Sequence, residues 1–165
     1  MLTQDVAHVP PPTPEPGRNV LRVLVAYDGS KGARAALARG IEVAVANHAL
    51  LTIAAVVEQP VVACTPFSAT CMPFTPEQMR RDAEQEMRRE LAAARDEVPA
   101  TVSVTTQLLC GRPARVLAAL AESGHYDLVV TGQTRRCRLF RLLRGSVTRR
   151  LLTRTHASVL AVKAA

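Results

Sequence analysis

The sequence predicts an α/β fold in which helices cover both faces of an open parallel sheet. Short apolar runs rich in β-branched residues alternate with segments whose apolar residues recur at helical spacing. The last such segment, Asp127 to Val162, has the order strand, loop, helix, strand, which is one βαβ unit. Apolar residues make up 48% of the chain, with no Trp and only three Phe, so the core must consist mainly of Ala, Val and Leu. Side chains of this size suit helices packed closely on a sheet.

The first predicted strand is Leu21 to Ala26, and Tyr27 to Ser30 turn the chain from it into a helix. The apolar face of that helix comprises Ala33, Ala36, Leu37, Gly40, Ile41 and Ala44. Asp28 stands at the carboxyl end of the strand, which faces the ligand crevice in doubly wound sheets. Two interpretations of Asp28 stay open: it contacts a ligand, or it only caps the turn, where Asp is common.

The second predicted strand is Leu50 to Val57, and a loop with Cys64 and Cys71 follows it. A thiol switch at these cysteines would need a lowered thiol pKa, and nothing in the sequence predicts one. A capping box, Thr75 with Gln78, starts the next helix. Its apolar stripe comprises Met79, Ala83, Met87, Leu91, Ala94 and Val98. We expect the methionines of this stripe to be core residues rather than the lining of a partner groove.

Three further strands and two helices complete the predicted fold. Thr101 to Leu109 is the third strand, and Pro113 opens a helix whose inward residues are Val116, Leu117 and Leu120. The fourth strand, Leu128 to Thr131, ends at Gly132. A basic loop then leads to Gly145 and Ser146, which is a suitable N-cap for a helix with Val147, Leu151 and Leu152 on its buried face. Ser158 to Val162 is the fifth strand.

The loop after the fourth strand brings a helix N-terminus to the carboxyl end of that strand. Unpaired N–H groups and the helix dipole favour an anion at such a place, so the sequence predicts a phosphate site. The spacing of Gly132, Arg135 and Gly145-Ser146 resembles the Gly-x2-Gly-x9-Gly-(Ser/Thr) motif in nucleotide-binding members of the universal stress protein family. In this chain Arg135 replaces the second glycine. The resemblance extends from about Leu21 to Lys163.

The resemblance implies a five-stranded parallel sheet of order 3-2-1-4-5 with about four helices on its two faces. It also implies that ATP or another adenine nucleotide, with or without Mg²⁺, binds in the crevice between the first and fourth strands. Asp28 matches the residue that touches the adenine, and Val56 matches the apolar residue that packs on the base. The phosphates would lie against Gly132, Arg135, Gly145, Ser146, Val147 and, as a lesser candidate, Thr148.

Arg135 leaves four outcomes open. Its side chain fills the phosphate space or forces the loop out of a positive φ, and both would weaken ATP binding. Alternatively the guanidinium swings outward, or it contacts the phosphates itself.

The charge distribution supplies an alternative function. The net charge is +7, and much of the excess lies in residues 135–154, with Arg135, Arg136, Arg138, Arg141, Arg144, Arg149, Arg150 and Arg154. This segment is a solvated face, a site for an anionic ligand, or a nucleic-acid surface that binds phosphates. Because aromatic residues that stack on bases are few, the sequence disfavours a single-strand binder.

Several catalytic and nucleotide-binding motifs are absent from the sequence. The sequence contains no P-loop, no G-x-G-x-x-G after the first strand and no G-x-S-x-G elbow, and neither Ser30 nor Ser146 has an evident base partner. We therefore assign no enzymatic activity beyond, at most, a slow ATPase. The four cysteines lack C-x-x-C spacing, so we expect neither a metal site nor a disulfide framework.

The sequence also gives predictions about the two ends of the chain and about its location in the cell. Residues 1–18 hold five of the eleven prolines and predict a disordered tail before a single domain at 19–165. The chain has no run of 18 apolar residues and no secretory signal, so we expect a cytoplasmic protein without a membrane segment. The last strand would lie at a sheet edge, where the family commonly forms a homodimer. The expected output is a conformational change or a contact with a protein partner.

Overall fold

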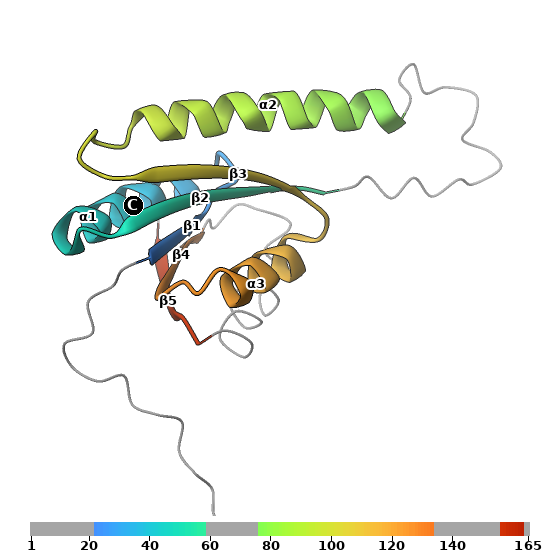
Figure 1. Cartoon of the computed structure of the whole chain (residues 1–165). Coiled ribbons are helices and arrows are strands. Elements are labelled where there is room, and N and C mark those ends of the chain that lie inside the picture. Colours follow the sequence, from blue (N-terminus) through green and yellow to red (C-terminus); the bar gives the residue numbers. More distant parts are fainter. Residues whose placement is uncertain (1–21, 59–75, 134–155, 164–165) are drawn as a thin grey trace, which may run out of the picture.

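The computed structural model describes residues 22–58, 76–133 and 156–163, and these form one five-stranded parallel sheet with helices on both faces (Figure 1). The strand order is β3-β2-β1-β4-β5, as predicted. The strands are β1 (Arg22–Ala26), β2 (Leu50–Val57), β3 (Val104–Cys110), β4 (Leu128–Gln133) and β5 (Ser158–Lys163). Among the described residues there are three helices: α1 (Lys31–Asn47), α2 (Pro76–Asp96) and α3 (Pro113–Ser123). The predicted Pro-rich tail and the helix expected after Ser146 lie outside the described residues.

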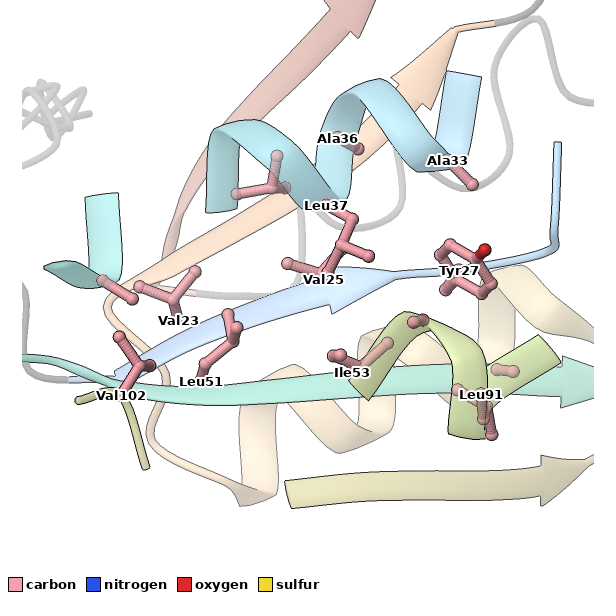
Figure 2. Packing of buried hydrophobic residues seen from close by; sticks show 14 of the residues in the cluster. Val23, Val25, Tyr27, Ala33, Ala36, Leu37, Leu51, Ile53, Leu91 and Val102 are labelled. Atoms are coloured by element: carbon pink, nitrogen blue, oxygen red, sulfur yellow. The ribbon is translucent and has the colours of Figure 1, made fainter. Parts of the chain in front are cut away.

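Helices α1 and α2 cover one face of the sheet. Alternate strand residues point to opposite faces, so the two faces have separate apolar clusters. The α1–α2 cluster joins Val25 and Ile53 of the sheet to Leu37 of α1 and Leu91 of α2, all of them buried. Figure 2 shows Tyr27 at one end of this cluster, between the first turn of α1 and Leu91.

Helix α3 covers the other face with a smaller cluster. Leu117, Ala118 and Ala121 of α3 pack with Leu24 of β1 and Val129 of β4. Leu24 and Val129 are completely buried, because they lie in central strands of the sheet. The fold therefore has one apolar layer on each side of β1 and β4, and both layers consist mainly of Ala, Val and Leu, as the composition predicted.

Strand β3 begins three residues later than the sequence predicted. Pairing with β2 starts at Leu51↔Val104 and ends at Val57↔Cys110. The residues before Val104 are still turning, since the Val102 N–H donates to the carbonyl of Pro99 at 3.0 Å. The alternating Thr and Val residues therefore predicted the strand correctly, but its predicted first residue, Thr101, was wrong.

The predicted apolar stripe of α2 is buried only in its second half. Leu91 and Ala94 are buried and Met87 is half-buried, but Ala83 is exposed and the exposed fraction of Met79 is 47%. The prediction of a core position was therefore wrong for Met79. The N-terminal part of α2 extends past the ends of β2 and β3 (Figure 1), so the sheet does not reach those turns.

Candidate functional site

The candidate site lies at the carboxyl ends of β1, β2 and β4, where the strand order reverses between β1 and β4. Ala26 of β1 pairs with Ala54 of β2 and with Thr131 of β4. Asp28 follows Ala26 by two residues, and Val56 follows Ala54 by two residues. Gly132 directly follows Thr131. The register therefore brings Asp28, Val56 and Gly132 to the same end of the sheet.

The turn between β1 and α1 is fixed by two local hydrogen bonds and by the conformation of one glycine. Asp28 is exposed, and its Oδ1 accepts a hydrogen bond from the Ser30 N–H at 3.1 Å. Gly29 has a φ of +72°, which glycine adopts without steric strain. Ser30 caps α1, because its hydroxyl accepts from the Ala33 N–H at 3.1 Å. Asp28 thus has the turn-capping role, and an ionised carboxylate keeps further acceptor capacity for a ligand.

Glu90 of α2 supports this turn from the α1–α2 face. Its Oε2 accepts from the Tyr27 hydroxyl at 3.4 Å and lies 3.7 Å from the Arg34 guanidinium. A Cβ added to Gly29 would meet the same Oε2 at 3.3 Å. Burial of Tyr27 raises the pKa of its hydroxyl above the ordinary 10.0, and the negative charge of Glu90 adds to that rise. Glu90 has no distinguishing signal in the sequence, because its partners are distant in the chain.

Val56 lies on the α3 face of the sheet. It is half-buried and packs against the cluster of Leu24, Ala54 and Val129, as does Ala26. Its side chain is thus both part of the sheet surface and accessible at the strand end. This position suits an apolar contact with a flat ring, which is the role that the family resemblance implied.

Gly132 has a packing reason to be glycine. A Cβ added there would lie 2.2 Å from the carbonyl carbon of Gly32, 2.3 Å from its oxygen and 2.5 Å from the nitrogen of Ala33. All three atoms belong to the backbone of the first turn of α1. The end of β4 therefore touches the α1 N-terminus directly, and the absence of a side chain makes this contact possible.

The remaining predicted phosphate residues, Arg135, Gly145, Ser146, Val147 and Thr148, lie outside the described residues. Within the described ranges, no group of three or more His, Cys, Asp or Glu side chains is arranged to hold a metal ion. No described helix is long and apolar enough to cross a membrane. Cys110 is exposed, and the other three cysteines lie outside the described ranges.

A hollow of about 320 Å³ lies at the opposite end of the sheet, and its lining includes Val45, His48, Leu50 and Val102. These residues belong to the end of α1, the start of β2 and the turn before β3. The hollow contains none of the predicted site residues, because those residues stand at the carboxyl ends of the strands.

Comparison with known proteins agrees with this geometry. The family model described as Universal stress protein family matches residues 19–163. The chain belongs to the universal stress protein family. Within this family, the chain is 40% identical over 62 residues to Universal stress protein MJ0531 of Methanocaldococcus jannaschii. That match spans 38% of this chain and 36% of the archaeal protein.

Solved structures of the universal stress protein family share the fold. A family member from Burkholderia pseudomallei is 26% identical, with a TM-score of 0.66 over 89% of this chain and 98% of its own. A universal stress protein crystallised in complex with cAMP is 24% identical, with a TM-score of 0.62 over 89% of this chain and 99% of its own.

Proposed function

We propose that this universal stress protein binds an adenine nucleotide at the crevice between β1 and β4 and acts as a non-catalytic stress-response or signalling module. The observation that carries the proposal is the meeting of Asp28, Val56 and Gly132 at one end of the sheet. Asp28 supplies an acceptor for the base and Val56 an apolar surface for its ring. Gly132 lets the end of β4 pack directly against the α1 N-terminus at the crevice. The related structure that holds cAMP supports an adenine ligand.

ATP is the ligand that the Gly-x2-Gly-x9-Gly-Ser spacing favours, with Arg135 as the departure from the motif. Mg²⁺ would accompany ATP through its phosphate oxygens. Phosphates would bind the N–H groups of Ser146 and Val147, since a helix N-terminus carries partial positive charge. Gly145 and Thr148 would complete the loop. The output would be a change in conformation or in partner contacts, within a cytoplasmic protein.

Calorimetric titration of the purified full chain with ATP tests the proposal, and Arg135→Gly tests the effect of the departure. Arg136→Gly is the matched control, because it removes the same charge from the neighbouring position. We expect ATP binding by the wild type, by Arg135→Gly or by both. If the wild type binds ATP weakly, and Arg135→Gly binds it more tightly while Arg136→Gly does not, then the Arg135 side chain is what obstructs the site. No binding by any of the three at millimolar ATP would reject the nucleotide function.

The arginine-rich segment 135–154 supports a second candidate, binding of nucleic acid or another polyanion. Eight arginines within twenty residues give this segment a high positive charge, and the whole chain carries a net charge of +7. Binding through phosphates releases counterions and so weakens steeply with salt. Salt-sensitive binding of DNA or RNA by a chain that does not bind ATP would favour this function over the first.

We further propose a homodimer that forms through β5. This strand ends the sheet on one side and pairs with β4 along its whole length, from Leu128↔Ser158 to Gln133↔Lys163. An edge strand offers unpaired backbone groups to a second copy of the chain. Light scattering at micromolar concentration should give the mass of a dimer, and a monomeric mass would refute the proposal.

A further inference from the structure

Thr131 carries a buried hydroxyl at the end of β4, directly before Gly132. The exposed fraction of the residue is 7%. Its Oγ1 is the one buried side-chain polar atom in residues 22–58, 76–133 and 156–163 without a hydrogen-bond partner. Burying a hydroxyl without a partner is unfavourable, and native proteins rarely do so without a functional reason. This atom therefore points to a group that the described chain does not supply.

The side chain of Thr131 lies on the same face of the sheet as Val56. Val130 belongs to the cluster under α1, whereas Val129 belongs to the cluster under α3. Because strand residues alternate between faces, Thr131 points to the α3 face with Val129. Val56 packs on that face as well, on the other side of β1.

The hydroxyl stands in a row of short side chains across the sheet. Ala54, Ala26, Thr131 and Ala161 are register partners on β2, β1, β4 and β5. The next row toward the amino ends contains Leu24 and Val129, which are larger. Within this row Ala54 is completely buried, Ala26 is half-buried and Ala161 is exposed, so a ligand would reach the row at its Ala26 and Ala161 positions.

We propose that Thr131 Oγ1 hydrogen-bonds the ribose and α-phosphate part of the bound nucleotide, as a binding residue outside the glycine motif. This inference rests on the proposed nucleotide function. Val56 on β2 and Thr131 on β4 are two strands apart, about 10 Å across the sheet, and Val56 lies two residues, about 7 Å, further along its strand, so the two positions are about 12 Å apart. A nucleoside with its base on Val56 passes over Ala26 and brings its 5′ end to β4. A threonine hydroxyl both donates and accepts, so it suits a ribose hydroxyl or a phosphate oxygen.

The test is the change Thr131→Val, which replaces the hydroxyl by a methyl group of similar size. We expect the affinity for ATP and for AMP to fall by about three- to tenfold, equally for the two ligands, because they share the adenosine monophosphate part. The unliganded variant should unfold at a higher temperature than the wild type, because the unpaired hydroxyl is gone. Thr131→Ser keeps the hydroxyl and should bind within about twofold of the wild type.

Thr52→Val is the matched control. Thr52 is also 7% exposed and lies on the same face, in the row of Leu24; its replacement should not change nucleotide affinity. Unchanged affinity of Thr131→Val in a chain whose wild type binds ATP would overturn the inference alone. A loss for ATP but not for AMP would place the hydroxyl against the terminal phosphates and also overturn it. If neither the wild type nor Arg135→Gly bound either nucleotide, the proposed function would be rejected, and the inference with it. If only Arg135→Gly bound ATP, the Thr131 variants would be compared in that background, with the same expected results.

Discussion

Replacing Gly132 by alanine separates its packing role from a role in ligand binding. The structure places an added Cβ at 2.2–2.5 Å from three backbone atoms of Gly32 and Ala33. Ordinary van der Waals contacts between heavy atoms are about 3.5–4.0 Å. The end of β4 and the first turn of α1 would therefore have to separate by more than an ångström. Backbone atoms cannot rotate away as a flexible side chain can, so the strain spreads into the sheet and the helix.

The expected loss of stability is at the upper end of the range for overpacked cores, about 3 kcal/mol. For a chain of this size, a loss of about 1 kcal/mol lowers the melting temperature by about 2–4 °C. The Gly132→Ala protein without nucleotide should therefore melt about 6–12 °C below the wild type. Differential scanning calorimetry with no ligand present measures this difference directly.

Gly40→Ala provides the comparison, because its Cβ would meet the buried Val25 Cγ2 at 2.4 Å, away from the candidate site. Both variants should lose stability without ligand, but Gly132→Ala should also lose nucleotide affinity, since it displaces the α1 N-terminus from the crevice. If unliganded Gly132→Ala melted at the same temperature as the wild type, the inferred close contact between β4 and α1 would be refuted. Close approach of the ligand would then be the remaining reason for a glycine at this position.

Three further predictions concern the turn after β1. Gly29→Ala should destabilise the protein by about 1–2 kcal/mol in urea unfolding, because an L-residue is strained at a φ of +72°. Equal urea midpoints for Gly29→Ala and the wild type would contradict the positive φ at Gly29. Ser30→Ala should cost about 1 kcal/mol in the same assay through loss of the α1 N-cap, whereas Ser30→Asp should preserve most of the stability. The pKa of Tyr27 is raised on folding, so the unfolded chain loses the Tyr27 proton at a lower pH than the folded chain does. The resulting contribution to stability is fully present below pH 10.0 and is lost as the pH rises toward the pKa of the folded state. Glu90→Gln should lower that pKa in an ultraviolet titration, with Tyr27→Phe identifying the signal, and an unshifted titration would show that the Glu90 charge does not act on Tyr27.

Much of the fold could be predicted from local patterns. The β-branched run Leu50 to Val57 gave β2 with its observed bounds, and Pro113 marked the start of α3. These signals are local, because strand length, alternation and helix starts depend on neighbouring residues. The α2 stripe was predicted too far toward the N-terminus, since a periodic pattern does not tell how far the supporting sheet extends.

The candidate site was predicted in part. Asp28 was identified by its place after the first strand, Val56 by the family resemblance alone and Gly132 by the glycine motif, and the sheet brings the three to one end. Glu90 and Thr131 carried no sequence signal. Glu90 is one charged residue among many on α2, and Thr131 is an ordinary member of an apolar strand.

The sequence alone determined the class of the fold, the order of its elements and the family, because each depends on spacing along the chain. Only the tertiary structure decided that Gly132 must fit against the first turn of α1, that Glu90 supports the Gly29 turn and that the Thr131 hydroxyl has no described partner. These facts depend on distances between segments far apart in the chain, which arise only when the sheet brings their backbones within contact.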